Sequence, residues 1–147
     1  MKIGITGSSG LIGSLFILKY GHDYDLIQFS GDMTNFEAVN KFMKTDFDIV
    51  FHLASVIPKY DVNGMPLDQS FSSNIVGTKN IAKAASKFNT KVIFTSTQRV
   101  YANKNQLKIT EEDKLKPDDM DEYGKSKLES EQILQNFLTP DNFVILR

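Results

Sequence analysis

Three glycines spaced three residues apart follow a short, largely apolar segment at the start of the chain. Gly7, Gly10 and Gly13 come directly after the segment Lys2–Thr6 and open a stretch, 11–20, with a helical pattern of apolar residues. Glycine permits a tight turn, lets another group approach the backbone, and lets a helix pack closely on a strand. A helix starting here offers unpaired N–H groups and a positive dipole end to an anion. The pattern therefore predicts a strand, a phosphate-binding turn and a helix.

The turn is expected to hold the phosphates of a dinucleotide. The spacing Gly-x-x-Gly-x-x-Gly differs from the Gly-x-Gly-x-x-Gly fingerprint of many dinucleotide-binding proteins. On this motif alone, an ordinary glycine-rich turn between strand and helix therefore stays open as the alternative. The residues expected to form the phosphate site are Gly7, Ser9, Gly10, Leu11, Ile12 and Gly13.

Composition excludes several classes of protein. The 147 residues are 41% hydrophobic and 24% charged, with a net charge of −1, so we expect a single globular domain over residues 1–147. No nucleic-acid partner is expected, because the lysines are spread along the chain. There is no cysteine, and no metal site is expected at His22 or His52, which lack a set of further ligands. Without a run of about 18 apolar residues or a leader, we expect no membrane partner and a cytoplasmic location.

Apolar segments of strand length alternate with amphipathic segments of helix length. The runs 49–51 and 92–94 are continuously hydrophobic, which is typical of parallel strands buried on both faces. The alternation predicts an α/β protein with a doubly wound parallel sheet, a Rossmann-like fold. The polar stretch 102–121 is predicted to be an exposed loop. The predicted strands are Lys2–Thr6, Asp25–Phe29, Asp48–Ala54, Lys91–Ser96 and Asn142–Leu146, and the predicted helices are 11–20, Asn35–Thr45, Phe71–Phe88 and Tyr123–Leu138.

A tyrosine and a lysine lie four residues apart in the last predicted helix. Tyr123 and Lys127 therefore share one face of that helix. Tyrosine has an unperturbed pKa of about 10, so it needs a nearby cation to act as acid or base near neutrality. The Lys127 ammonium can supply that charge and can also bind ribose hydroxyls. The alternative is a half-buried tyrosine beside a solvated lysine, with no chemical role.

Further polar residues follow the predicted strands. Thr97 comes after the strand 91–96, at the edge where doubly wound sheets bind ligands. It is either a substrate-facing hydroxyl or a β-branched residue that fills the strand end. His52 is predicted to pack or to form hydrogen bonds instead of taking part in catalysis. Asn74 is included among the expected cofactor-binding residues, and it either braces neighbouring strand ends or caps its helix. The small residues expected to lie beside an adenosine are in the run Leu53, Ala54 and Ser55.

Five motifs along the chain resemble those of one family. They fall in the order and roughly the spacing of the extended short-chain dehydrogenases/reductases, in the NAD-dependent epimerase/dehydratase family that acts on nucleotide sugars. The resemblance covers nearly the whole chain. The motifs are Gly7–Gly13, Val50–Ala54, Asn74–Thr78, Ser96–Tyr101 and Tyr123–Glu129.

The resemblance implies a cofactor, NAD or NADP, and a catalytic triad of Thr97, Tyr123 and Lys127. In that scheme Tyr123 exchanges a proton with a sugar hydroxyl and Thr97 steadies the same oxygen. Lys127 adjusts the acidity of the phenol and binds the nicotinamide ribose, while hydride moves between sugar carbon and nicotinamide. The implied enzyme is a nucleotide-sugar epimerase or oxidoreductase, and a non-catalytic dinucleotide-binding or regulatory module is the alternative. Family members often dimerise through the tyrosine-bearing helix and its neighbour, here the region Phe71–Phe88, which implies a homodimer; the alternative is that Phe71 and Phe88 belong to the core.

The chain departs from the family pattern around the cofactor and at its end. Ser30 stands where an acidic residue usually binds the adenosine ribose, and no arginine lies beside it to receive a 2′-phosphate. Asp32 and Met33 resemble the motif that lies near the adenine. NAD and NADP both stay open, with the glycine spacing favouring NAD. The chain ends at Arg147, so the C-terminal substrate-binding lobe of the family is expected to be absent, in a fragment or in a shortened protein.

A further departure concerns the reaction. Gln98 and Arg99 follow Thr97 at positions where the dehydratases of the family carry an acidic pair for water elimination. The sequence therefore favours epimerisation or oxidoreduction over dehydration.

Overall fold

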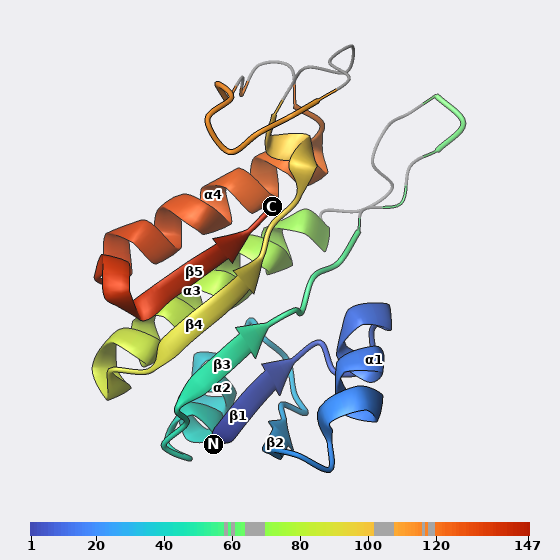
Figure 1. The fold of residues 1–147 in the computed structure, drawn as a ribbon. Helices are drawn as coiled ribbons and strands as arrows, with labels where there is room; N and C mark the ends of the chain where they lie inside the picture. Colours follow the sequence, from blue (N-terminus) through green and yellow to red (C-terminus); the bar gives the residue numbers. More distant parts are fainter. Residues whose placement is uncertain (58, 60, 64–69, 102–107, 116, 118–119) are drawn as a thin grey trace.

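Five parallel strands form one sheet, and helices lie on both of its faces (Figure 1). The computed structural model describes residues 1–57, 59, 61–63, 70–101, 108–115, 117 and 120–147. The elements in chain order are β1 (Lys2–Thr6), α1 (Leu11–Tyr20), β2 (Asp25–Gln28), α2 (Phe36–Met43), β3 (Ile49–His52), α3 (Ser70–Phe88), β4 (Lys91–Thr95), the 3₁₀ helix η1 (Gln98–Val100), α4 (Glu122–Phe137), the 3₁₀ helix η3 (Pro140–Asn142) and β5 (Phe143–Leu146).

The strand order is β2-β1-β3-β4-β5. The chain starts at β1, moves outward to β2 and then returns past β1 to β3, so the direction of winding reverses between β1 and β3. One row of the register runs from Ile5 through Phe51 and Ile93 to Val144. All five strands point to the same edge of the sheet (Figure 1). This confirms the predicted doubly wound α/β fold, whose ligands bind outside the carboxyl ends of the strands at such a reversal.

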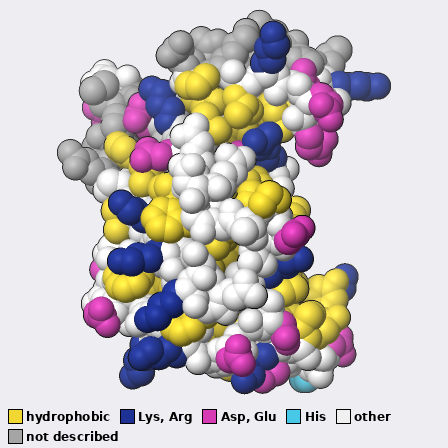
Figure 2. All heavy atoms as spheres, turned by 90° about the vertical axis from the view of Figure 1, so that its left-hand side faces the viewer, with side chains coloured by type: hydrophobic (Ala, Val, Ile, Leu, Met, Phe, Trp, Pro, Cys, Tyr) yellow, Lys and Arg dark blue, Asp and Glu magenta, His cyan; other side chains and the backbone are white. Residues whose placement is uncertain are grey.

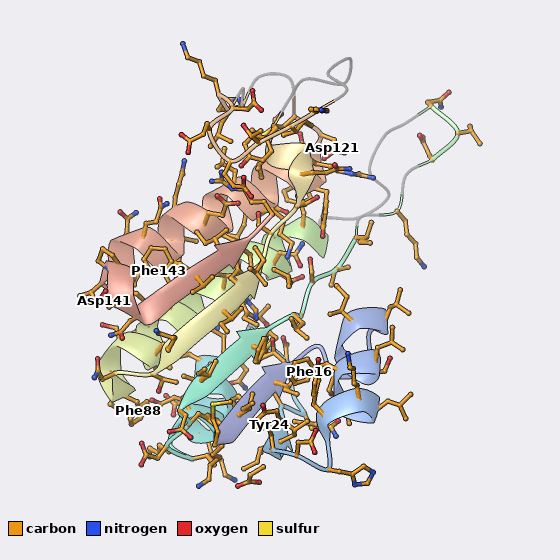
Figure 3. All side chains as sticks on the ribbon, viewed as in Figure 1. Phe16, Tyr24, Phe88, Asp121, Asp141 and Phe143 are labelled. Carbon is orange, nitrogen blue, oxygen red and sulfur yellow. The ribbon has the colours of Figure 1, made fainter. Side chains whose placement is uncertain are left out.

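The two faces of the sheet are covered unequally. Helices α2, α3 and α4 cover one face and bury the main apolar core. On the opposite face, α1 directs Phe16 toward the sheet (Figure 3), with its ring centroid 4.8 Å from that of Phe51. The buried core residues are Val39, Met43, Phe47, Val50, Ile81, Ala82, Ala84, Ala85, Val92, Phe94, Leu134 and Leu138.

Polar side chains fix the starts of two helices. The Asn35 side chain accepts a hydrogen bond from Ala38 N at 3.1 Å and caps α2. The Asp121 side chain accepts one from Gly124 N at 2.7 Å and caps α4. Such caps satisfy amide groups that have no partner within the helix. The predicted boundaries are therefore wrong by one or two residues, because Asn35 precedes its helix and Glu122 already belongs to the next.

The polar stretch 102–121 is not exposed throughout, which corrects the prediction for it. Residues 102–107, 116 and 118–119 lie outside the described part. Met120 is buried and belongs to a second apolar cluster with Val100, Tyr101 and Leu128. Each of these side chains removes apolar surface from water. The cluster therefore holds the described end of this stretch against α4.

The surface carries charges of both signs. On the face drawn in Figure 2, Lys and Arg side chains are interleaved with acidic and hydrophobic groups.

Among the residues described, no helix has the length and apolar character needed to cross a membrane.

Candidate functional site

The turn after β1 is closed tightly against the segment after β3. Gly7 has a φ of +72°, and a Cβ atom added there would lie 2.5 Å from Ala54 N. Both the backbone conformation and the space therefore require glycine. Leu53 N donates a hydrogen bond to Thr6 O at 3.2 Å, which extends the pairing of β1 and β3 to this point. Segments separated by almost fifty residues thus meet at the carboxyl edge of the sheet.

The first turn of α1 packs on this glycine turn. A Cβ added at Gly13 would lie 2.3 Å from Gly7 O, so only glycine allows the helix to begin here. Gly10 is the N-cap and has no side-chain cap hydrogen bond, and no acidic residue lies in the first turn. The amide groups at the start of α1 therefore have no side-chain cap, which is the arrangement that suits an anion. The other predicted phosphate residues, Ser9, Leu11 and Ile12, are exposed around this helix start.

A cleft of about 180 Å³ lies between the end of β3, the chain after β2 and the start of α3. The structure brings five of the predicted cofactor residues together around it, whereas Leu53 and Ser30 do not line it. The five are Asp32, Met33, Ala54, Ser55 and Asn74. The further lining residues, which the sequence analysis did not assign to the cofactor, are Gly31, Thr34, His52, Val56, Ser73 and Gly77. Most of these residues are sequence neighbours of the predicted ones, and this was the signal that could have assigned them to the site.

Asn74 ties α3 to the chain beyond β3. Its Oδ1 accepts a hydrogen bond from Val56 N at 2.7 Å, and its Nδ2 donates to Val56 O at 2.8 Å. The capping interpretation of Asn74 is wrong, because α3 begins at Ser70. The two bonds brace the segment after β3, which is one of the strand ends that the bracing interpretation named.

The acidic residue of the cleft is held by its own loop. The Asp32 carboxylate accepts hydrogen bonds from Thr34 N and Thr34 Oγ1, both at 2.8 Å. These two bonds lower the pKa of Asp32 below its ordinary value, the backbone bond contributing most. Asp32 is therefore ionised at neutral pH.

His52 also lines the cleft and is 1% exposed. Its Nδ1 lies 2.8 Å from Thr6 Oγ1 and its Nε2 lies 3.0 Å from Thr78 Oγ1, so both ring nitrogens are hydrogen-bonded. Burial, assisted by the charge of Lys127, lowers the pKa of His52 to about 3. The ring is neutral near pH 7, which confirms the prediction of a packed, hydrogen-bonded histidine.

The Lys127 side chain lies on the buried face of α4 and is 2% exposed. Its Nζ donates to Thr95 O at 2.7 Å and lies 4.6 Å from the centroid of the Phe94 ring. Burial lowers the pKa of Lys127 to about 8, against the opposing charge of Glu131. The Nζ lies 5.9 Å from the centroid of the Tyr123 ring. The alternative of a solvated lysine is therefore wrong.

Thr97 lies between β4 and η1 and is half-buried. Its Oγ1 accepts a hydrogen bond from Arg99 N at 3.3 Å and caps η1. The Arg99 guanidinium carbon lies 5.7 Å from the centroid of the Tyr123 ring. Arg99 also pairs with Asp121 at 2.8 Å, beside the start of α4 (Figure 3). The segment that carries Thr97 thus lies against the end of α4 that carries Tyr123.

A charged cluster next to Lys127 was missed by the sequence analysis. Glu131, one helical turn after Lys127, accepts a hydrogen bond from Ser96 Oγ and pairs with Arg147 at 2.6 Å. Arg147 Nη1 donates to Tyr101 Oη at 2.7 Å. The spacing of Lys127 and Glu131 was a signal in the sequence, but nothing there indicated Arg147 as the partner.

The fold and the glycine turn define a Rossmann-like α/β protein. Its first helix begins after the glycine turn, where the winding of the strand order reverses. Residues 3–147 match the NAD dependent epimerase/dehydratase family, and the chain belongs to it. Members of this family include nucleotide-sugar enzymes that bind NAD(P).

Several known proteins are similar to this chain. A UDP-glucose 4-epimerase of Bacillus subtilis (strain 168) is 28% identical over 170 residues, covering 97% of this chain and 49% of that protein. The structure of a UDP-glucose 4-epimerase from Bifidobacterium longum in complex with NAD+ and UDP has a TM-score of 0.84 at 25% identity, covering 100% of this chain and 52% of that one. A dTDP-4-dehydrorhamnose reductase from Clostridium acetobutylicum ATCC 824 has a TM-score of 0.81 at 30% identity, covering 99% and 52%. The chain spans about half the length of these relatives.

Proposed function

We propose that this chain binds NAD or NADP along the carboxyl edge of its sheet and carries the acid-base residues of a nucleotide-sugar epimerase or oxidoreductase. The observation that carries the proposal is the buried Lys127 ammonium, 5.9 Å from the Tyr123 ring. This pair lies at the same sheet edge as the glycine turn and the cleft. A buried cation beside a phenol has a chemical use that a surface lysine lacks.

The residues on the cofactor side fit a dinucleotide. The start of α1 offers its amide groups to the pyrophosphate, and any side-chain atom added at Gly7 or Gly13 would collide with backbone. We assign the adenosine to the cleft, between Met33 and the small residues after β3. Ser30 is exposed beyond β2 and offers a hydroxyl instead of a carboxylate to the ribose. NAD is favoured by the glycine spacing alone, since solved relatives hold NAD+ or NADP.

On the catalytic side, Tyr123 exchanges a proton with a substrate hydroxyl and Thr97 donates a hydrogen bond to the same oxygen. Lys127 places its positive charge beside Tyr123 and binds the ribose next to the nicotinamide. The bound cofactor supplies the carbon that accepts or returns hydride. Gln98 and Arg99 follow Thr97 in place of two acids, so the proposed reaction is epimerisation or oxidoreduction and not dehydration.

The part of the enzyme that we assign to this chain follows from the length of the match. The chain corresponds to about half of each relative, and we assign to residues 1–147 one domain with the cofactor site and the acid-base residues. From this chain alone we expect weakened cofactor binding and no selectivity among sugars. Efficient conversion of a nucleotide sugar by the 147-residue chain would contradict that expectation.

Titration of the chain with NADH and NADPH, followed by nicotinamide fluorescence, tests the cofactor site. Gly10→Val is the matched control, because Gly10 has an ordinary φ of −75° while a valine side chain would block the helix start. We expect saturable binding that the variant loses without loss of fold. No binding of either nucleotide to the wild-type chain would refute a self-sufficient cofactor site.

Replacement of Tyr123 by Phe, in a full-length form that includes a substrate-binding lobe, tests the catalytic role. We expect retained cofactor affinity and turnover lower by about a thousandfold, the scale of general acid-base catalysis. Unchanged turnover would remove Tyr123 from the mechanism. Cofactor binding without any turnover, in both proteins, would instead favour the alternative of a non-catalytic dinucleotide-binding module.

A further inference from the structure

The buried carboxylate of Glu131 connects α4 to the ends of β4 and β5. It accepts a hydrogen bond from Ser96 Oγ, at the end of β4. Arg147, at the end of β5, donates from Nε to both carboxylate oxygens at 3.1 and 3.2 Å and from Nη2 to Oε2 at 2.6 Å. The Glu131 side chain is 1% exposed and the Arg147 side chain 21%. A bidentate, charge-assisted pair of this kind fixes orientation as well as distance.

The cluster holds the segment that carries Thr97 from both ends. Before Thr97, Lys127 Nζ donates to Thr95 O, while Ser96 N donates to Leu146 O at 2.6 Å and Ser96 Oγ donates to Glu131. After Thr97, the buried Tyr101 accepts a hydrogen bond from Arg147 Nη1 at 2.7 Å. Thr97 therefore lies between two anchors, one of which includes Glu131 and the other Arg147.

Glu131 also acts on the charge of Lys127. Burial alone would favour the neutral amine of Lys127, because a buried ammonium loses its hydration. The carboxylate one helical turn away opposes that effect. The other titratable groups around Lys127 are His52 from β3, which is neutral near pH 7, and Tyr123 from α4. Lys127 also contacts the Phe94 ring and the Thr95 carbonyl of β4.

We propose that Glu131 is a positioning residue that keeps Lys127 protonated beside Tyr123 and, through Ser96 and Arg147, fixes the segment that presents Thr97. This inference rests on the proposed catalytic role of Thr97, Tyr123 and Lys127. The Glu131 side chain is 1% exposed, so its proposed role is exerted on neighbouring side chains. It acts by charge on Lys127 and by hydrogen bonds on the segment 95–101.

The test is a pH titration of the Lys127 side chain by nuclear magnetic resonance in the lysine-labelled 147-residue chain. The signal is assigned by its loss in Lys127→Met. In Glu131→Gln we expect the midpoint of Lys127 to move to lower pH, with the ratio of ammonium to amine at pH 8 falling about tenfold. Glu129→Gln is the matched control, because Glu129 is an exposed carboxylate two residues from Lys127 on the same helix. The control is expected to leave the midpoint in place.

A second variant serves if Glu131→Gln does not fold. Arg147→Gln removes the cation that offsets the Glu131 carboxylate. The negative charge of Glu131 then acts more strongly on Lys127, so we expect the titration midpoint of Lys127 to rise. A purely structural role would lower the melting temperature in both variants and leave the midpoint of Lys127 unmoved. That result, or equal shifts in Glu131→Gln and Glu129→Gln, would overturn the inference.

The readout separates this inference from the proposed function. Titration of Lys127 requires neither cofactor nor substrate, so it decides the role of Glu131 even if NADH does not bind. If NADH binds and Tyr123→Phe abolishes turnover while Glu131→Gln leaves Lys127 unaffected, only the role of Glu131 is lost.

Discussion

The glycine turn between β1 and α1 and the charged cluster beneath α4 lie at the same edge of the sheet, yet they depend on opposite properties of side chains. The turn excludes side-chain atoms, because an added Cβ would meet backbone 2.5 Å away at Gly7 and 2.3 Å away at Gly13. The cluster requires its side chains, because Lys127 and Glu131 are buried charges with hydrogen-bonded partners.

Under the proposed function, the glycine turn binds the cofactor and the charged cluster supports the acid-base residues. A turn of glycines leaves amide groups unpaired and open, so an anionic ligand can complete them. A buried ion pair is already complete, and removing either partner leaves an uncompensated charge. We therefore expect variants of the turn to fail by adding atoms, and variants of the cluster to fail by removing them.

The largest expected effect is that of Gly7→Ala. A methyl group there combines an unfavourable positive φ with a collision against Ala54 N, so we expect the free energy of unfolding to fall by about 4 kcal/mol. Urea denaturation followed by circular dichroism measures it. In the control, Gly10→Ala, the nearest atom to the added Cβ is Gly7 O at 3.3 Å, and the expected loss stays below about 1 kcal/mol. Equal losses would show that the turn is not tightly closed.

The next effect compares two ion pairs of α4. Arg147→Gln breaks the buried pair with Glu131, and we expect a loss of about 3 kcal/mol in the free energy of unfolding. Arg99→Gln breaks the pair with Asp121, whose side chains are 55% and 39% exposed, and should cost less than about 1 kcal/mol. The same urea titration compares both variants. A small loss in both would mean that the cluster does not depend on the buried pair.

The dependence of stability on pH tests His52, which lies between the two regions. Its pKa is about 3 in the folded chain and 6.5 is its ordinary value, so the unfolded chain binds more protons between these values. The stability from neutral His52 is therefore fully present above pH 6.5 and is lost as the pH falls toward 3.

Between pH 6.5 and 5 we expect His52 to account for a loss of about 2 kcal/mol. In His52→Gln, which keeps polar atoms near Thr6 and Thr78, that part of the loss should vanish. Urea titrations of both proteins at each pH measure it. Parallel pH profiles of the two proteins would contradict the buried, neutral state of His52.

The smallest effect is expected for Asn74→Ala, in the cleft that we assign to the adenosine. The variant loses two hydrogen bonds to the backbone of Val56, which is itself exposed, so we expect a loss of about 1 kcal/mol. Loosening of the chain after β3 should also weaken NADH binding in the fluorescence titration. Asn35→Ala, which removes the cap of α2, should cost a similar amount, about 1 kcal/mol, without weakening NADH binding. Equal NADH affinities in the two variants would show that Asn74 does not shape the cleft.

Local patterns made much of the fold predictable. The bounds of β1 and α1 agree with the sequence prediction, and the other boundaries differ by at most two residues. The glycine turn was predictable because its glycines are close in the chain. Burial of Met120 within a polar stretch was not, because its partners Val100 and Leu128 come from other segments.

The sequence by itself determined the alternation of strands and helices and the glycine turn, and it placed the chain in its family, because periodicity and short motifs are properties of neighbouring residues. Only the tertiary structure decided that Lys127 is buried, that Asn74 braces Val56 and that Glu131 pairs with Arg147. Each of these depends on which strands lie side by side, and the order β2-β1-β3-β4-β5 brings together residues that are distant in the chain. The surroundings that set a pKa or fix a side chain form only when the sheet does.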